Sequence, residues 1–306
     1  MQMQQSKNSL AVLSVFRNEA DVMEEFLQHN IWFGVDKFYL VNNNSDDDWE
    51  PVVKKYEDKV KMYFEPKITG RDEILKETGI QINSYNKILK TGDISEKWLL
   101  ICDMDEFFYM RKGTKLKTLL DYLEHNNISQ LLIPLKTYNS CGLIEQPKSI
   151  RKSFIKRHIQ NPSVVKGTHG ITKALVRISD VKSIGITASQ LKEGKITTDG
   201  SLKERDVSLS NNINFHLPHG ALKKYRFVDD DIFLKTYICC NHYTTMSYNR
   251  FFNVKATRGI GDISKKEIGR VGGISYWKNK WEKQESKKTI IDTEMRDLLE
   301  KDNVIL

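Results

Sequence analysis

Three carboxylates fall within four residues directly after an apolar stretch of the chain. The apolar stretch is Leu99–Cys102, and the carboxylates are Asp103, Asp105 and Glu106. Ligands of α/β proteins bind beyond the carboxyl ends of strands, where crowded carboxylates need a cation to offset their charge. Because two aspartates one residue apart can share a hard divalent ion, we predict a manganese or magnesium site on Asp103 and Asp105. An acidic turn that caps the next helix is the simpler alternative.

Polar clusters also follow two earlier apolar runs, residues 10–16 and 36–41. The polar residues are Asn18, Glu19, Asn42, Asn43 and Ser45. Amides and small hydroxyls at strand ends can bind a base, a ribose or a phosphate, so we predict that these residues contact the nucleotide of a donor. Taken alone, the first cluster is explained better by an ordinary helix start, and the second is explained equally well by a plain turn.

Histidine and basic residues supply a third group of candidates late in the chain. His242 could complete the metal site, and Lys173 could offset charge beside it. Lys255 and Arg258 are three residues apart, so on a helix they would share a face and could hold a diphosphate. A core histidine and a solvated basic face are the alternatives.

The elements that must position these residues alternate between strand and helix up to about residue 135. The expected strands are 10–16, 36–41, 60–64, 98–102 and 131–135, and the expected helices cover 22–31, 72–90 and 116–123. This alternation predicts an α/β fold with a mostly parallel sheet and helices on both faces. We expect one domain over 1–306, with a nucleotide-binding half at about 9–136 and a more irregular acceptor half at about 137–306. Residues 185–215 are polar and aperiodic, which favours an excursion from the sheet.

Composition restricts the class of protein further. The chain has 306 residues, 39% of them hydrophobic, and 48 basic against 40 acidic residues give a net charge of +8. No apolar run reaches the roughly 18 residues that a transmembrane helix needs. The polar N-terminus shows no signal-peptide core, and the four cysteines match no zinc motif, so we expect reduced thiols and a cytoplasmic location. The positive charge favours anionic partners such as nucleotides or a phospholipid surface.

The order of these motifs resembles that of glycosyltransferase family 92 and its bacterial and viral relatives. The matching segments are 16–19, 38–45, Gln81 with Tyr85 and Asn86, 103–107, 140–142, and 242–259 with its histidine, lysine and arginine. The resemblance implies a GT-A type fold, a UDP-sugar donor, manganese, and inverting transfer of a galactose-like sugar to a glycan or lipid-linked acceptor. Peripheral contact with a membrane is compatible with it, and we expect no nucleic-acid partner. The sequence departs from the family in having Asn42 where relatives carry aspartate, and in matching no pattern over 178–214.

An inverting displacement also needs a carboxylate base on the acceptor side, separate from the metal ligands. We predict Glu145, three residues beyond Gly142 in a turn after a strand, over Asp206 and its acidic neighbours. Two other functions remain open. A metal-dependent nucleotidyltransferase would want a glycine-rich phosphate loop, which residues 16–20 lack, and a polyanion-binding module leaves the carboxylate cluster unexplained.

Overall fold

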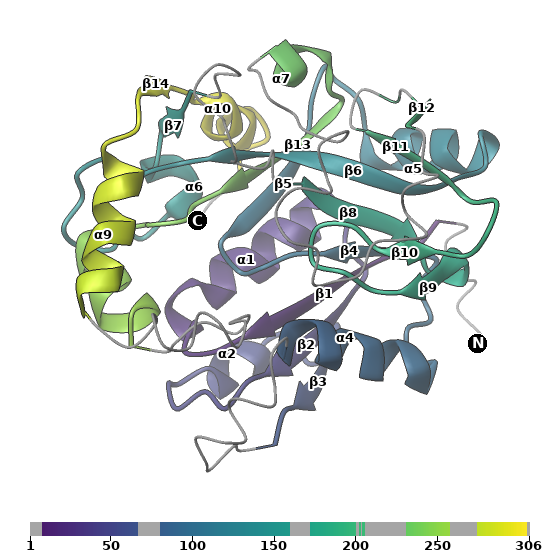
Figure 1. Ribbon diagram of the computed structural model, residues 1–306, viewed down its shortest axis with the longest axis horizontal. Helices are drawn as coiled ribbons and strands as arrows, with labels where there is room; N and C mark the ends of the chain where they lie inside the picture. The colour runs from purple at the N-terminus through teal and green to yellow at the C-terminus, as the bar shows by residue number, and fades with distance from the viewer. Residues whose placement is uncertain are drawn as a thin grey trace.

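A ten-stranded mixed sheet runs through the centre of the molecule (Figure 1). The computed structural model describes residues 8–66, 80–159, 172–199, 202, 204–205, 231–257 and 274–304. The main strand order is β12-β11-β6-β8-β4-β1-β2-β3, with β13 and β5 branching from β6. These strands are β1 Leu10–Phe16, β2 Lys37–Asn42, β3 Val60–Phe64, β4 Trp98–Ile101, β5 Glu106–Met110, β6 Ile128–Thr137, β8 Thr172–Arg177, β11 Ile196–Asp199, β12 Glu204–Arg205 and β13 Ile238–His242.

The N-terminal strands β3, β2, β1 and β4 are all parallel to one another. Strand β1 is a continuous apolar run because both of its faces are covered. Leu10 and Val12 lie in one hydrophobic core, while Ala11 and Leu13 lie in the other. The expected α/β class and the strands predicted before residue 136 are confirmed.

Strands from later in the chain complete the same sheet. Strand β8 lies between β4 and β6 and is antiparallel to both, and β11 pairs in parallel with β6. The expectation of an excursion over 185–215 is therefore wrong for 196–199 and 204–205, which form β11 and β12 of the sheet. The isolated hairpin of β9 Val181–Ser183 and β10 Gln190–Leu191 does leave the sheet, and residues 206–215 of that segment lie outside the described residues.

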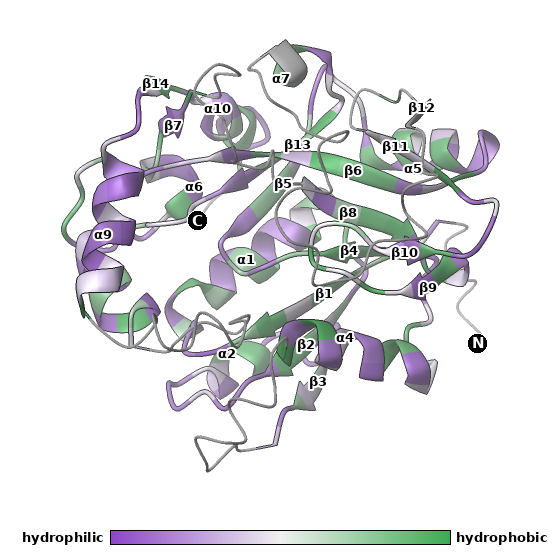
Figure 2. Ribbon diagram, in the orientation of Figure 1, coloured by the Kyte–Doolittle hydropathy of each residue, from purple (hydrophilic) through white to green (hydrophobic). Residues whose placement is uncertain are grey.

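Helices cover both faces of the sheet. Helices α1 Ala20–Phe33 and α5 Leu116–His125 pack into one core, and α4 Ile80–Thr91 packs into the other (Figure 1). The strands beneath them are the most hydrophobic part of the ribbon (Figure 2). The helix expected over 72–90 is described from Ile80 onward, and its first residues lie outside the described ranges. The shorter helices are α2 Glu50–Lys54, the 3-10 turn η1 Ile178–Asp180, α6 Ile150–Ser153 and α7 Asp231–Lys235.

Buried ion pairs attach the C-terminal elements to the sheet. These elements are α8 Tyr248–Arg250, the π-helix η4 Phe251–Lys255, α9 Ile274–Glu285, β14 Thr289–Ile291 paired with β7 Lys156–His158, and α10 Glu294–Lys301. Lys136 of β6 is 2% exposed, and its ammonium lies 2.9 Å from Asp292 and 2.7 Å from Glu294. Through these contacts β6 holds the start of α10. Among the described residues, no helix has both the length and the hydropathy to cross a bilayer.

Candidate metal and nucleotide site

The acidic residues occupy a tight turn between β4 and β5. The Glu106 amide donates to the Asp103 carbonyl at 3.1 Å, and the Asp103 amide donates to the Glu106 carboxylate at 2.9 Å. Strand β4 ends at Ile101 and β5 begins at Glu106, so this turn lies at the carboxyl end of a central parallel strand. The sheet therefore places the three carboxylates at the edge where α/β proteins bind their ligands.

Lys173 neutralises part of this charge from the adjacent antiparallel strand. Strand β8 runs opposite to β4, so its first residues lie beside the turn. The Lys173 ammonium lies 2.9 Å from Asp103 and 3.0 Å from Glu106, and its side chain is 2% exposed. Burial alone would lower the pKa of Lys173, but the two carboxylates outweigh it and hold that pKa well above its usual value. Lys173 is thus a permanently charged counter-ion within the site.

His242 reaches the carboxylates because β13 pairs with β5. The register sets His242 opposite Glu106. The Nε2 atom of His242 lies 3.5 Å from an Asp105 oxygen and 4.0 Å from a Glu106 oxygen. Ligand atoms of Asp105, Glu106 and His242 all lie within 4.8 Å of one another, close enough to bind one ion. The two carboxylates supply the oxygen donors that manganese and magnesium prefer, and the imidazole adds a nitrogen donor that a transition metal such as manganese accepts more readily than magnesium.

The three carboxyl groups differ in how readily they ionise. Burial tends to raise the pKa of Asp105, but Lys255 and His242 outweigh it and hold the pKa well below its usual value. Burial also opposes ionisation of Asp103, and Lys173 reverses the effect and lowers its pKa. For Glu106 burial dominates, and its pKa rises to about 7. Asp103 and Asp105 are therefore anionic at neutral pH, whereas Glu106 lies close to its titration midpoint.

Asp103 is also held by a hydrogen-bond chain from the opposite face of the sheet. The Gln81 amide donates to Asp103 at 2.6 Å and to the hydroxyl of Tyr85 at 2.9 Å. That hydroxyl also accepts from the Val15 amide at 3.1 Å. The hydrogen bonds connect α4, β1 and the acidic turn, which accounts for the burial of a glutamine and a tyrosine on the inner face of α4. Asp103 is 36% exposed and lies beside the three-residue ligand group rather than within it.

Lys255 approaches the site from the end of the π-helix. Its ammonium lies 2.8 Å from Asp105 and 2.7 Å from the Thr244 carbonyl oxygen. A π-helical turn is uncommon and is found frequently at functional sites. The structure thus brings Lys255 to the acidic turn. Arg258, predicted to share its helix face, lies outside the described residues.

The polar residues after β1 and β2 bind each other. The Asn18 amide donates to the Ser45 hydroxyl at 3.0 Å, and the Asn18 side chain accepts from the Asp46 amide at 2.9 Å. Asn42 accepts from the Ser45 amide at 2.7 Å. Asn18 has a φ of +51°, a left-handed conformation that asparagine tolerates better than most residues. These contacts fix two strand-end loops side by side, as a binding rim requires.

Two of the remaining predicted residues belong to these loops, and the third, Glu145, lies against α8. Asn43 is 9% exposed, and its amide donates to the Phe16 carbonyl at 2.9 Å. Glu19 is 5% exposed, and its carboxylate lies 3.8 Å from the guanidinium of Arg250. Glu145 is exposed and accepts a hydrogen bond from Asn249 at 2.5 Å, on the segment that leads to Lys255.

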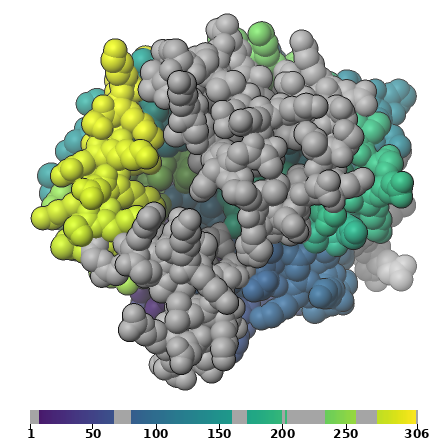
Figure 3. Space-filling model, in the orientation of Figure 1, coloured from purple at the N-terminus to yellow at the C-terminus, as the bar shows by residue number. Residues whose placement is uncertain are grey.

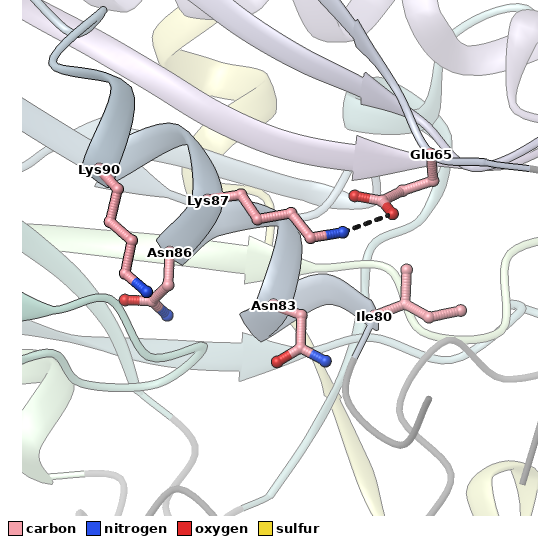
Figure 4. A pocket seen from close by; sticks show the side chains of 6 residues that line it. All are labelled: Glu65, Ile80, Asn83, Asn86, Lys87 and Lys90. Atoms are coloured by element: carbon pink, nitrogen blue, oxygen red, sulfur yellow. Dashed lines mark hydrogen bonds and ion pairs between the residues drawn. The ribbon is translucent and has the colours of Figure 1, made fainter. Parts of the chain in front are cut away.

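A polar pocket lies on the outer side of α4. It has a volume of about 250 Å³ and is lined by Glu65, Ile80, Asn83, Asn86, Lys87 and Lys90 (Figure 4). Glu65 follows β3, and its carboxylate lies 3.3 Å from Lys87. The lining residues of α4 recur at helical spacing on the face turned away from Gln81. The pocket therefore opens on the far side of α4 from the acidic turn.

Two residues of the site were not predicted in their observed roles. Glu106 joins the ligand group, although the sequence predicted Asp103, Asp105 and His242 as the metal ligands. Arg250 binds Asp21 of α1 with two hydrogen bonds of 2.7 and 3.1 Å, which ties α8 to the helix after β1. The alternation of side chains along β5 could have identified Glu106, but the contact of Arg250 spans 229 positions and leaves no local signal.

Comparison with known proteins identifies the family of this chain. The family model described as Glycosyltransferase family 92 matches residues 11–303. The chain belongs to glycosyltransferase family 92, which is the class of protein that the sequence predicts. Together with the sheet order, membership confirms an α/β fold of the GT-A type.

Curated relatives match only part of the chain. A glycosyltransferase family 92 protein of Ricinus communis is 21% identical over 145 residues, which is 46% of this chain and 24% of that protein. A second alignment to a protein of that name is 23% identical over 153 residues, again 46% of this chain and 25% of the relative. The chain thus covers about a quarter of the length of the curated relatives it matches.

Solved structures resemble the chain more loosely. S. aureus TarS, residues 1–349 in complex with UDP, has a TM-score of 0.34 and 17% identity, and the match covers 56% of this chain and 47% of that one. Glucosyl-3-phosphoglycerate synthase from Mycobacterium tuberculosis, in complex with Mn²⁺, UDP-glucose and phosphoglyceric acid, has a TM-score of 0.30 and 12% identity. That match covers 57% of this chain and 58% of the other. TM-scores of this size are too low to transfer a ligand between proteins.

Proposed function

We propose that this protein is a metal-dependent glycosyltransferase that moves a sugar from a UDP-sugar to a hydroxyl of a glycan or lipid-linked acceptor. Family membership supports the reaction class. The proposal that the protein binds a metal and a diphosphate rests on the acidic turn at the carboxyl end of β4. His242, Lys173 and Lys255 surround this turn. Well-packed apolar residues would often stabilise this part of the fold at least as well as a buried cluster of charges, so the cluster indicates a function rather than a contribution to stability.

Asp105, Glu106 and His242 would hold the ion, with Asp103 beside them. When bound, manganese or magnesium supplies positive charge that stabilises the diphosphate as it leaves. Lys255 touches Asp105 already, so its ammonium lies where it can also contact a phosphate oxygen. Arg258, three positions further, is proposed to act in the same way. Lys173 stabilises the conformation of the turn because it forms ion pairs with both Asp103 and Glu106.

The nucleoside is proposed to bind at the rim made by the loops after β1 and β2. The amide and hydroxyl groups of Asn18, Asn42, Asn43 and Ser45 lie there, and Glu19 lies behind them. Glu145 is proposed as the base that takes the acceptor proton during an inverting displacement. Its place on the segment facing Asn249 puts it on the side of the C-terminal half, separate from the metal ligands.

A donor hydrolysis screen tests the proposal without knowledge of the acceptor. Purified protein is incubated with UDP-galactose, UDP-glucose, UDP-N-acetylglucosamine and GDP-mannose, with manganese or with chelator, and release of the nucleoside diphosphate is measured. We expect metal-dependent release of UDP from at least one UDP-sugar, and its loss in Asp105→Asn. The matched control is Asp58→Asn, because Asp58 is an exposed aspartate just before β3, at the opposite end of the parallel strands from the acidic turn and the rim.

Two results would reject the proposal. One is the absence of hydrolysis from every donor while the same protein binds no UDP. The other is activity that persists in chelator and in Asp105→Asn. Release of pyrophosphate from a nucleoside triphosphate, with no action on sugars, would instead support a nucleotidyltransferase.

A further inference from the structure

Five aromatic side chains meet where α8 and the π-helix pack against α9. They are Tyr248, Phe251, Phe252, Trp277 and Trp281. Trp281 is central, with ring centroids 5.3 Å from Tyr248, 5.1 Å from Phe251 and 5.7 Å from Phe252. Tyr248 and Phe252 are themselves 4.7 Å apart. Such offset and edge-on contacts hold aromatic rings in fixed orientations.

The cluster has a buried layer and an outer layer. Phe251 and Trp277 are 0% and 5% exposed and belong to the interior. Tyr248 is 41% exposed, and Phe252 and Trp281 are partly exposed beside it. The C-terminal segment that contributes α9 forms one side of the molecular surface (Figure 3). Three contiguous aromatic rings at the surface are more than the scattered apolar exposure of ordinary proteins, and they mark a contact site.

The π-helix connects this aromatic surface to the candidate metal site. Phe252 and Lys255 are three residues apart in the π-helix, and Lys255 contacts Asp105. On the other side, Glu285 at the end of α9 accepts hydrogen bonds from the Ser140 hydroxyl at 2.8 Å and from Thr245 at 3.3 Å. Phe252 of the aromatic surface therefore lies about one helical turn from Lys255, which contacts the acidic turn.

Polar groups border the aromatic surface. Asn249 follows Tyr248 directly, and its amide donates to the exposed carboxylate of Glu145. A pyranose ring presents C–H groups on one face, which pack against aromatic rings, and hydroxyls at its edge, which bond to amides and carboxylates. Rigid aromatic rings with an amide and a carboxylate at the edge match both features.

We propose that Tyr248, Phe252 and Trp281 form a subsite that stacks a sugar ring of a neutral glycan acceptor. The inference rests on the proposed glycosyltransferase function and specifies its acceptor as a carbohydrate. A membrane surface is the competing occupant, because aromatic residues and lysines also bind lipid interfaces. The exposed lysines Lys278 and Lys283 of α9 would favour a bilayer. The exposed carboxylate of Glu145, on the segment hydrogen-bonded to Tyr248 and Asn249, would instead repel anionic lipid at the rings themselves.

The test is binding of four neutral disaccharides, lactose, cellobiose, maltose and N,N′-diacetylchitobiose, followed by the intrinsic fluorescence of Trp281 and its neighbours. We expect a saturable change with at least one disaccharide. Tyr248→Ala should weaken that binding by about tenfold, or about 1.4 kcal/mol, because it removes a ring on which the sugar stacks. Tyr248→Phe keeps the ring and should bind like the wild type.

Tyr122→Ala is the matched control, since Tyr122 is an equally exposed tyrosine, 41%, on α5. Thermal unfolding of each variant checks that the fold is intact. No saturable change with any of the four sugars, or equal binding by Tyr248→Ala, would overturn the proposal. Binding to phosphatidylglycerol vesicles that depends on Tyr248, without disaccharide binding, would assign the surface to a membrane. Disaccharide binding together with failure of the donor screen would reject the proposed enzyme function but not the sugar subsite.

Discussion

Lys173 is the residue on which the charge balance of the acidic turn depends. Its ammonium bridges Asp103 and Glu106, and all but 2% of its side chain is buried. Without it, Glu106 would lie in the interior with no cation closer than His242 among the described residues, at 4.0 Å. A carboxyl in that position would retain its proton, and it could then neither repel its neighbours nor bind an ion.

Lys173→Met should therefore destabilise the protein, by about 3–5 kcal/mol, because it removes one partner of a buried ion pair. The loss should grow with pH. The pKa of Glu106 is already raised to about 7 and would rise further, so the folded protein holds a proton that the unfolded chain releases. Stability of the variant should thus fall as pH rises from 5 to 8. Urea unfolding at both pH values measures it.

Lys55→Met is the control for this variant, because Lys55 pairs with Glu24 at 3.0 Å on the surface, with side chains 56% and 41% exposed. Its loss should cost about 0.5 kcal/mol or less. Equal free energies of unfolding for the two variants would show that Lys173 is not the counter-ion of the turn.

Glu145 is proposed as the base that an inverting displacement requires, and the contact that the structure gives its carboxylate is with Asn249. As a base it should be replaceable by glutamine without loss of fold, while transfer to an acceptor falls by about 10²-fold or more. Metal-dependent binding of UDP should be unchanged. Steady-state transfer rates with the acceptor identified by the disaccharide screen provide the measurement. Near-normal transfer would exclude Glu145 and shift attention to Asp206, which lies outside the described residues.

At the scale of elements, the parallel part of the sheet was predictable and its later additions were not. Strand β1 is continuous in apolar residues because neighbouring side chains enter different cores. Strand β8 has only Ala174–Val176 as an uninterrupted apolar core, flanked by Lys173 and Arg177, whose charges pair with distant residues. In the sequence, a lysine near a strand end indicates the end of the strand, and only its buried partners in the structure show that the strand continues through it.

The same limit applies to the candidate site. Its aspartates follow an apolar strand and are visible in the sequence, whereas the approach of His242 depends on the pairing of β13 with β5 across more than 100 positions. Lys255 reaches Asp105 through a π-helical turn rather than the regular helix that its spacing predicted. Polar residues after β1 and β2 were located correctly, but the sequence could not show that they bind each other.

The anchoring of α10 to β6 gives an element-scale prediction. Burial raises the pKa of Asp292 and of Glu294, but Lys136 outweighs it and lowers both. Their stabilisation is present above the unfolded values, near pH 4, and is lost as pH falls through the lowered folded values. Lys136→Met should cost about 3–5 kcal/mol at pH 7. This deficit should shrink towards pH 3, as the carboxylates protonate.

Guanidinium unfolding of the wild type and Lys136→Met between pH 3 and pH 7 measures the effect, again with Lys55→Met for comparison. A deficit that stays constant over this range would mean that the packing of the lysine stem, and not its charge, holds α10 in place.

At the scale of the whole molecule, the net charge of +8 is opposite in sign to the cluster of carboxylates in the acidic turn. The protein as a whole attracts a nucleoside diphosphate, but the acidic turn alone would repel its phosphates. Lys173 and Lys255 offset part of that repulsion, and a divalent ion on Asp105, Glu106 and His242 would offset the rest. Binding of the diphosphate should therefore require the metal, while binding of uridine should not.

Titration calorimetry of UDP into the protein, with manganese and with chelator, tests the central claim most directly. We predict at least about tenfold tighter binding of UDP with manganese, and direct binding of manganese that Asp105→Asn weakens by about 10- to 100-fold. Uridine should bind equally with and without the ion, and Asp58→Asn should behave like the wild type. UDP binding of equal strength in chelator, or manganese binding by Asp105→Asn that matches the wild type, would contradict the assignment of this turn as the metal and diphosphate site.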